Sequence, residues 1–198
     1  MKIFEDISVV VEKVKKGEVV IVFDEQREHE ADLVVSAELL TPQHINFMIT
    51  WGRGLVCVPL TAEKLQTLEI KLLSSTDPLG TKWCMSLDAA SGVTTGISAF
   101  DRAFTIRRLV NQKSVATDFT RPGHVFPLLA SAGGLKERQG HTEASIELMK
   151  FAGLAPMAVI CEIIRDDGSM AELEDLVKFS KKHELVMCTI DQLVKYKV

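Results

Sequence analysis

Apolar residues in the first part of the chain recur at helical spacing and then form a continuous run. The helical pattern consists of Ile3, Phe4, Ile7, Val10, Val11 and Val14. It predicts a helix over about 4–16, with Gly17 as its end, because glycine adopts the left-handed conformation that closes many helices. The β-branched run 19–23 predicts a buried strand, and a second strand is expected near 32–36.

Capping residues and short apolar runs locate the remaining elements. Further helices are predicted over 42–51, after Thr61, over 99–111, over 142–152, over 170–183 beginning near Ser169, and after Thr189. Further strands are predicted at 55–60, 83–88, 124–130, 157–164 and 186–190. Thr41 is expected to cap the helix over 42–51, with Pro42 in its first turn. Ser98 followed by Asp101 resembles a capping box, and Thr142 is expected to be an N-cap. Pro127 favours an edge strand or a bulge, because proline has no N–H to donate.

Strands and helices alternate, but several neighbouring strands are joined by segments too short for a crossover helix. This pattern predicts a mixed β-sheet with helices on its faces. The stretch 74–92 combines turn residues with a weak apolar pattern. We interpret it as a mobile functional loop within one domain that spans 1–198.

The composition is that of an ordinary soluble globular domain. The 198 residues are 46% hydrophobic and 25% charged, with a net charge of −4. No cluster of Lys and Arg indicates a nucleic-acid surface, and no apolar run approaches the roughly 18 residues of a membrane helix. The four cysteines are not spaced as metal ligands. We therefore expect reduced, mostly buried thiols in a cytoplasmic protein, with Cys84 either exposed or packed beside Trp83.

The most unusual stretch is the segment 24–32, Asp-Glu-Gln-Arg-Glu-His-Glu-Ala-Asp, which lies between two strand-like runs. Its five carboxylates repel one another unless a positive group joins them. A hard divalent cation with oxygen ligands would do so. A solvated hairpin loop is the simpler interpretation of this segment taken alone.

Three further places combine polar groups with apolar surroundings. His124 follows Arg-Pro-Gly at the mouth of a predicted strand. Arg138 and His141 precede a predicted helix, and the free N–H groups of a helix start bind phosphate well. Glu162 lies in an otherwise apolar run, where burial suits a carboxylate to general acid–base work. The alternatives are a structural histidine, a surface cation and a salt-bridged carboxylate.

With these stretches taken together, the sequence resembles the 3,4-dihydroxy-2-butanone 4-phosphate synthase family of the riboflavin pathway over nearly its whole length. The resemblance rests on the motifs at 24–32, 86–88, 92–98, 101–103, 121–128 and 138–144, and on Glu162. Two positions depart from the family pattern: Ala31 is Gly in many members, and His29 is commonly Asn. Neither position has an assigned chemical role.

The resemblance implies a role for each candidate site residue. Glu28 and His141 would bind a catalytic Mg²⁺ or Mn²⁺, whereas His124 and Glu162 would perform the proton transfers. The implied substrate contacts are Arg27, Glu28, Asp32, Thr95, Arg138, Gln139, Gly140, His141, Thr142 and Glu162. Cys57 is also expected near the substrate.

The resemblance further implies a fold, an assembly and a reaction. The family fold is a three-layer α+β sandwich around a mixed sheet, and its members are homodimers with sites near the interface. The implied enzyme is a lyase that converts D-ribulose 5-phosphate to L-3,4-dihydroxy-2-butanone 4-phosphate and formate. The chain length indicates the form without a fused GTP cyclohydrolase II domain. The alternatives are a phosphosugar-binding protein without catalysis and a different metal-dependent phosphosugar lyase or isomerase, and formate release distinguishes them.

Overall fold

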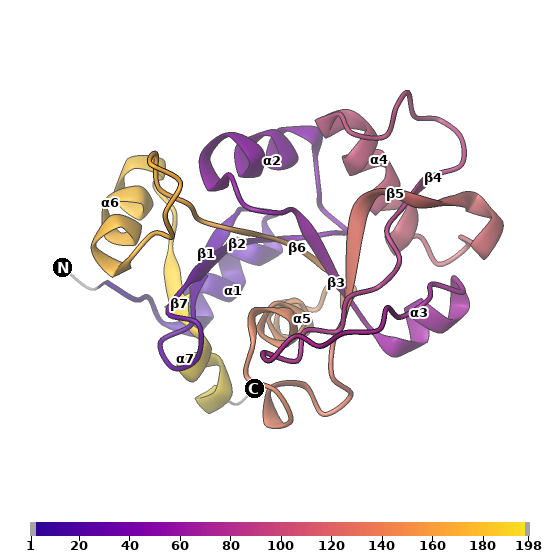
Figure 1. Cartoon of the computed structure of the whole chain (residues 1–198). Coiled ribbons are helices and arrows are strands. Elements are labelled where there is room, and N and C mark those ends of the chain that lie inside the picture. Colours follow the sequence, from indigo (N-terminus) through magenta and orange to yellow (C-terminus); the bar gives the residue numbers. More distant parts are fainter. Residues whose placement is uncertain (1–2, 197–198) are drawn as a thin grey trace.

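The computed structural model describes residues 3–196, and in that part of the chain a seven-stranded mixed sheet forms the centre (Figure 1). Its strands are β1 (Val20–Phe23), β2 (Ala31–Ser36), β3 (Cys57–Leu60), β4 (Leu87–Ala89), β5 (Phe119–Leu129), β6 (Ala158–Glu162) and β7 (Met187–Thr189). The spatial order is β4-β5-β3-β6-β2-β1-β7. The pairs β3–β5 and β1–β7 are parallel and the other pairs are antiparallel, which confirms the predicted mixed sheet. The domain predicted over 1–198 includes residues 1–2 and 197–198, which lie outside the described residues.

Alternating side chains along the strands place an apolar layer on each face of the sheet. The helices are α1 (Ile7–Lys15), α2 (Pro42–Phe47), α3 (Ala62–Thr67), α4 (Ala99–Val110), α5 (His141–Phe151), α6 (Leu173–His183) and α7 (Ile190–Lys195). Ile21 and Leu33 belong to the core beneath α2, α4 and α6, whereas Val22 and Val34 belong to the core beneath α1, α5 and α7. Figure 1 shows α2 and α4 above the strands and α5 and α7 below them. The three-layer α+β sandwich is therefore confirmed.

Most helices lie where the apolar pattern placed them, with small differences at their ends. The helix expected over 42–51 consists of α2 and a π-helical turn, Met48–Gly52. Thr41 caps α2 as predicted, because its hydroxyl accepts the His44 N–H while the His44 ring accepts the Thr41 N–H at 3.2 Å.

Two predicted helix starts and one predicted capping box are wrong in detail. Thr142 lies inside the first turn of α5, and Gly140 is the N-cap residue. Helix α6 begins after Glu172 and not near Ser169. Ser98 does cap α4, but the Asp101 carboxylate bonds to the segment that precedes the helix instead of completing a capping box.

Strand β5 is longer than predicted, and it lies between β3 and β4 instead of at the edge of the sheet. The edge-strand prediction for Pro127 is therefore wrong. Pairing with β4 ends at Leu87, opposite Val125, so the missing N–H of Pro127 falls beyond the regular ladder. Of the strand predicted at 83–88, residues 87–89 form β4, while Trp83 and Cys84 make isolated bridges.

All four cysteines are buried and unpaired, which confirms the prediction of free buried thiols. Cys84 is packed inside, with 2% of its surface exposed, so the exposed alternative is wrong. Within residues 3–196, no helix is both long enough and apolar enough to cross a membrane.

Candidate active site

A cleft of about 320 Å³ opens where the end of β6, the start of β2 and the first turn of α5 meet. Its lining is Glu28, Glu30, Asp32, Cys57, Asp77, Leu79, Thr81, Trp83, Leu128, Arg138, His141, Thr142, Ile160 and Glu162. Two cavities elsewhere on the described chain are larger, at about 450 and 460 Å³, but neither is lined by a buried carboxylate. The chemistry expected from the sequence is concentrated in the smaller cleft.

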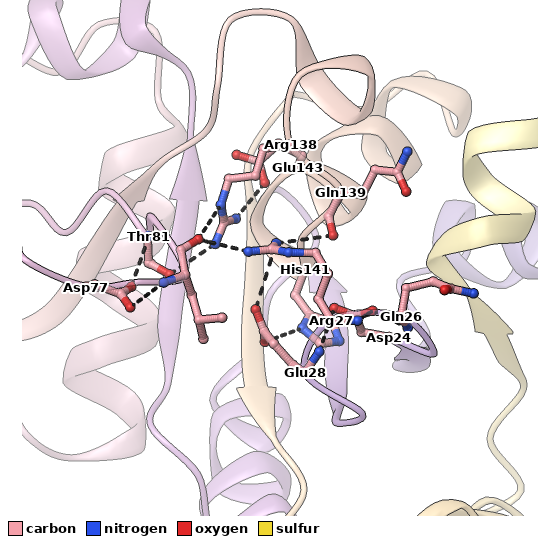
Figure 2. A network of polar contacts seen from close by, with 11 residues as sticks. Asp24, Gln26, Arg27, Glu28, Asp77, Thr81, Arg138, Gln139, His141 and Glu143 are labelled. Atoms are coloured by element: carbon pink, nitrogen blue, oxygen red, sulfur yellow. Dashed lines mark hydrogen bonds and ion pairs between the residues drawn. The ribbon is translucent and has the colours of Figure 1, made fainter.

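The segment 24–30 forms a tight turn that is held from inside by Asp24. The Asp24 side chain is buried, and its Oδ1 accepts the N–H groups of Gln26 and Arg27 at 2.9 and 3.0 Å. His29 has a φ of 56°, in the left-handed region that a turn of this kind requires. The segment joins the antiparallel strands β1 and β2, so it is a hairpin loop, but it is not simply solvated. Glu28 lies against His141 and Arg27 donates to the Gln139 carbonyl, both toward α5 (Figure 2).

Glu28 and His141 meet on the floor of the cleft. Glu28 Oε2 lies 3.4 Å from Nδ1 of His141, whose Nε2 is buried without a hydrogen-bond partner among the described residues. The pairing with His141 is the main reason that the pKa of Glu28 is lowered, although burial opposes it. Burial disfavours the charged form of His141, but the carboxylates of Asp32 and Glu28 outweigh this and raise its pKa to about 9.

Asp32 and Glu162 face the same cleft from neighbouring strands. They are directly opposite each other in the register of β2 and β6. Burial, together with the charges of nearby carboxylates, raises the pKa of Asp32 to about 7. Oε2 of Glu162 accepts the Leu55 N–H at 2.8 Å, and a Cβ at Gly54 would lie only 2.5 Å from this oxygen. Gly54 therefore gives the Glu162 carboxylate room to lie against the backbone.

Two arginines converge at the mouth of the cleft (Figure 2). Arg27 Nη2 donates to the Leu79 carbonyl at 2.9 Å, and Nε and Nη2 of Arg138 donate to the same oxygen at 3.3 Å. Arg138 Nη2 also donates to Thr81 Oγ1 at 3.0 Å. A Cβ at Gly140 would lie 2.4 Å from Arg138 and 3.0 Å from Arg27, so a side chain at this position would displace the ends of both arginines.

Asp77 and Glu143 belong to the same network but were not assigned a role from the sequence. The Asp77 carboxylate accepts the N–H groups of Leu79 and Thr81, which shapes the segment 77–81 at the rim. Glu143 is buried and accepts from Arg138 at 2.7 Å. Asp77 lies two residues before Leu79 and four residues before Thr81, whose N–H groups it accepts. An acid at this spacing is the sequence signal of an Asx turn. Glu143 directly follows Arg138–Thr142, the segment predicted to bind the substrate.

His124 and Thr95 are not among the residues that line the cleft. Asp88 holds His124 through two contacts, accepting its backbone N–H at 2.9 Å and lying 2.7 Å from Nδ1. His124 lies in β5 and Glu162 at the end of β6, and β3 separates these two strands. Since neighbouring strands lie about 4.8 Å apart, β5 and β6 are about 10 Å apart. Thr95 is exposed in the loop before α4.

The remaining candidates lie around the two arginines. Gln139 O accepts from Arg27 Nη1 at 3.3 Å, and Gly140 and Thr142 surround His141 at the start of α5. Cys57 lines the cleft as expected. Nine of the predicted site residues are therefore brought together in or beside one cleft: Arg27, Glu28, Asp32, Arg138, Gln139, Gly140, His141, Thr142 and Glu162.

The chain as a whole matches a known protein family. A sequence profile of 3,4-dihydroxy-2-butanone 4-phosphate synthase matches residues 8–196. The chain belongs to the 3,4-dihydroxy-2-butanone 4-phosphate synthase family. It is 50% identical, over 98% of its length, to riboflavin biosynthesis protein RibBA of Aquifex aeolicus, and equally similar to RibBA of Bacillus cereus (strain G9842). The chain spans about half the length of these family members, 49% in each case.

Solved structures of synthases in this family have the same fold. A 3,4-dihydroxy-2-butanone 4-phosphate synthase of Candida albicans is 45% identical with a TM-score of 0.90, and the match covers 98% of both chains. A structure of a synthase in complex with two magnesium ions is 40% identical with a TM-score of 0.93. That match covers 97% of this chain and 96% of the other.

Proposed function

We propose that this protein converts D-ribulose 5-phosphate to L-3,4-dihydroxy-2-butanone 4-phosphate and formate, as a step of riboflavin biosynthesis. The observation that best supports the proposal is the joint content of the cleft. An acidic group paired with a histidine lies on its floor, and two arginines lie at its mouth. A phosphosugar bound with a divalent cation presents the complementary groups, a phosphate at one end and hydroxyl and carbonyl oxygens at the other.

Glu28 and His141 are the proposed ligands of Mg²⁺, with Mn²⁺ as an alternative ion. Glu28 Oε2 and His141 Nδ1 lie 3.4 Å apart, and the unpartnered Nε2 shows that the histidine is not satisfied by the chain alone. Residues 3–196 contain no group of three or more His, Cys, Asp or Glu side chains placed to hold a metal. Two protein ligands fit Mg²⁺, which usually keeps several waters and binds through its substrate. When bound, the cation supplies Lewis-acid polarisation of the substrate carbonyl.

The arginine end of the cleft is the proposed phosphate site. Arg27 and Arg138 already point two guanidinium groups at one oxygen atom, that of Leu79. The start of α5 adds free N–H groups and the positive end of its dipole beside Gly140 and Thr142. Asp32 and Gln139 are proposed to contact the sugar hydroxyl groups, and the rim segment 77–81, within the stretch 74–92, is the proposed lid over them.

Glu162 and His124 are the proposed proton-transfer groups. Asp88 lies against Nδ1 of His124 and thereby favours the tautomer whose Nε2 is free to accept a proton. The reaction removes the C3 proton and expels the C1 hydroxyl as water. C5 then shifts from C4 to C3, so that the C4–C5 bond breaks as the C3–C5 bond forms, and hydrolysis of the C3–C4 bond releases C4 as formate. Water enters in that last step, so the water lost earlier is balanced and no other reactant is needed.

A second copy of the chain is proposed to bring His124 and Thr95 to the cleft of its partner. His124 is separated from Glu162 by the width of two strands, and both His124 and Thr95 are partly or fully exposed. Trp51 and Phe100 are exposed apolar side chains that line one cavity, and Ile97 is exposed two residues from Thr95. Exposed apolar groups beside one another indicate an interface, which supports the homodimer.

Product analysis tests the proposed reaction. We expect purified protein with ribulose 5-phosphate and Mg²⁺ to give formate and the four-carbon phosphate in a one-to-one ratio, as measured by NMR. Tightly bound, unchanged substrate would favour the phosphosugar-binding alternative. A five-carbon product would favour an isomerase. Absence of formate from folded, metal-replete protein contradicts the proposal.

A further inference from the structure

We infer that Glu143 is a positioning residue that aims the guanidinium group of Arg138 at the substrate phosphate. The inference rests on the proposed function, because it gives Arg138 the phosphate as its ligand. Among the described residues, Glu143 does not line the cleft, and Arg138 is the cation of the site to which it is bonded. Its effect is therefore exerted through Arg138.

Both oxygens of Glu143 are engaged within the protein. Oε2 accepts from Arg138 Nη1 at 2.7 Å, and Oε1 accepts the Ser131 backbone N–H at 2.9 Å. Only 1% of the residue is exposed. A buried carboxylate must be paired, and its place in the first turn of α5 adds the favourable field of the helix dipole. These contacts fix the carboxylate against two separate segments of the chain.

This anchor turns the other edge of Arg138 toward the mouth of the cleft, where an anion can replace its present acceptors. With Nη1 held by Glu143, the Nε and Nη2 groups form the edge that faces Leu79 O and Thr81 Oγ1 at the mouth of the cleft. That edge presents two parallel N–H donors, the arrangement that binds a phosphate through two oxygens. A Cβ at Gly140 would lie 2.4 Å from Arg138 Nη1, so the guanidinium group occupies the space that this glycine leaves.

Two effects of the Glu143 charge oppose each other. A negative charge near the phosphate weakens anion binding, whereas correct aiming of Arg138 strengthens it. The Glu143 carboxylate lies on the far side of the guanidinium group from the cleft mouth, and its charge is already compensated by Arg138 and the Ser131 N–H. We therefore expect the loss of aiming to dominate when Glu143 is changed.

Glu143→Gln tests the inference with little change in shape. Its amide has one accepting and one donating end, so it can accept from Ser131 or from Arg138 but not from both. We expect KM for ribulose 5-phosphate to rise about tenfold or more with kcat within about twofold, because a phosphate contact acts alike in ground and transition states. Calorimetry with inorganic phosphate should show a parallel loss of affinity. Glu147→Gln, which removes an equal charge one turn later on α5, should leave both unchanged.

A double-mutant cycle separates aiming from a merely structural role. In an Arg138→Ala background, Glu143→Gln should have almost no further effect on phosphate affinity, because the group that it positions is gone. Additive losses would overturn the inference, as would unchanged or tighter phosphate binding by the single variant. Wild-type protein that does not bind phosphate at millimolar concentration would overturn it too.

Arg138→Lys keeps the inference testable if Glu143→Gln does not fold. The ammonium group can still pair with Glu143 but has no two-donor edge, so phosphate affinity should fall nearly as far as with Arg138→Ala. Wild-type affinity in Arg138→Lys would contradict the inference. Normal phosphate binding without formate production would instead contradict the proposed function and leave the role of Glu143 intact.

Discussion

At the scale of single residues, the cleft gives neighbouring carboxylates different surroundings. Glu28 is paired with His141, which lowers its pKa and keeps it an anion suited to a cation. Glu162 has a hydrogen-bond partner at Oε2 alone among the described residues, so Oε1 is available to the cleft. Asp32 lies between them with a pKa raised to about 7 by burial. The cleft therefore contains one carboxylate kept ionised, which suits the proposed metal site, and one whose pKa lies near neutral pH.

The proposed roles of Glu162 in proton transfer and of Arg138 in phosphate binding predict separate kinetic effects. Glu162→Gln should lower kcat by about 10²-fold, the usual scale for removal of a positioned acid or base. His124→Ala should act in the same way. Arg138→Ala should chiefly raise KM, because a phosphate contact exists before and during the reaction. Steady-state kinetics check this, with circular dichroism as the control for folding. Near-normal kcat for Glu162→Gln together with no turnover of Arg138→Ala at saturating substrate would reverse the assignments.

The two-ligand metal site predicts weak binding of the free ion. We expect EDTA to abolish activity and Mg²⁺ to restore it, and calorimetry without substrate to show a dissociation constant in the millimolar range, because most ligands must come from water and substrate. Glu28→Gln should abolish the heat of Mg²⁺ binding in this measurement. Glu30→Gln is the matched control at the rim of the same cleft. Full activity after exhaustive chelation would exclude the proposed role of the ion.

At the scale of elements, the sequence was informative where local chemistry decides structure. Apolar periodicity placed α1 and α4, and Thr41 with Pro42 placed α2. Long-range pairing was not visible in this way. The pattern around Pro127 indicates an edge, but β4 covers β5 only as far as Val125, and no local signal gives the position of that end.

The candidate site likewise has one part that local sequence predicts and another part that depends on long-range contacts. The segment 24–32 was recognised because its charges are adjacent in sequence, and so was 138–144. The sequence does not single out Glu143, because its partners Ser131 and Arg138 meet it only after folding. The Asx-turn pattern at Asp77 is local, but it marks a turn and not a functional site. The separation of His124 from Glu162 follows from strand order, which single-sequence patterns do not contain.

The cap of α2 predicts a small pH dependence of stability. His44 Nδ1 accepts the Thr41 N–H, which requires a neutral ring, and burial lowers the pKa of His44. The unfolded chain therefore takes up this proton first. The contribution to stability is complete above the ordinary pKa of 6.5 and is lost as pH falls below it.

The matched variant is His44→Gln, because glutamine at this position of a capping box accepts the same N–H without titrating. Between pH 7.5 and 5.5 the wild-type Tm should fall by about 2 °C more than that of His44→Gln. Scanning calorimetry at both pH values checks this. Equal decreases of Tm in the two proteins would show that protonation of His44 does not weaken the cap.

At the scale of the whole molecule, the positions of His124 and Glu162 predict that activity depends on assembly. Light scattering should show a dimer at working concentration. If each site takes Glu162 from one copy and His124 from the other, then unfolding and refolding a mixture of inactive Glu162→Gln and His124→Ala proteins should restore about a quarter of wild-type activity. Half of the randomly formed dimers are mixed, and each has one intact site of two. No restored activity, or a fully active monomer, would contradict the shared site.

The Leu79 carbonyl has a consequence for ligand design. Without an anion, the chain supplies its own neutral acceptor to Arg27 and Arg138. A compound that merely fills the cleft leaves those bonds in place and gains nothing from either cation. An inhibitor with two adjacent anionic oxygens competes directly with the protein backbone, and the displaced segment around Pro78 is then free to move. We expect the strongest inhibitors to be those that take over both guanidinium groups at once.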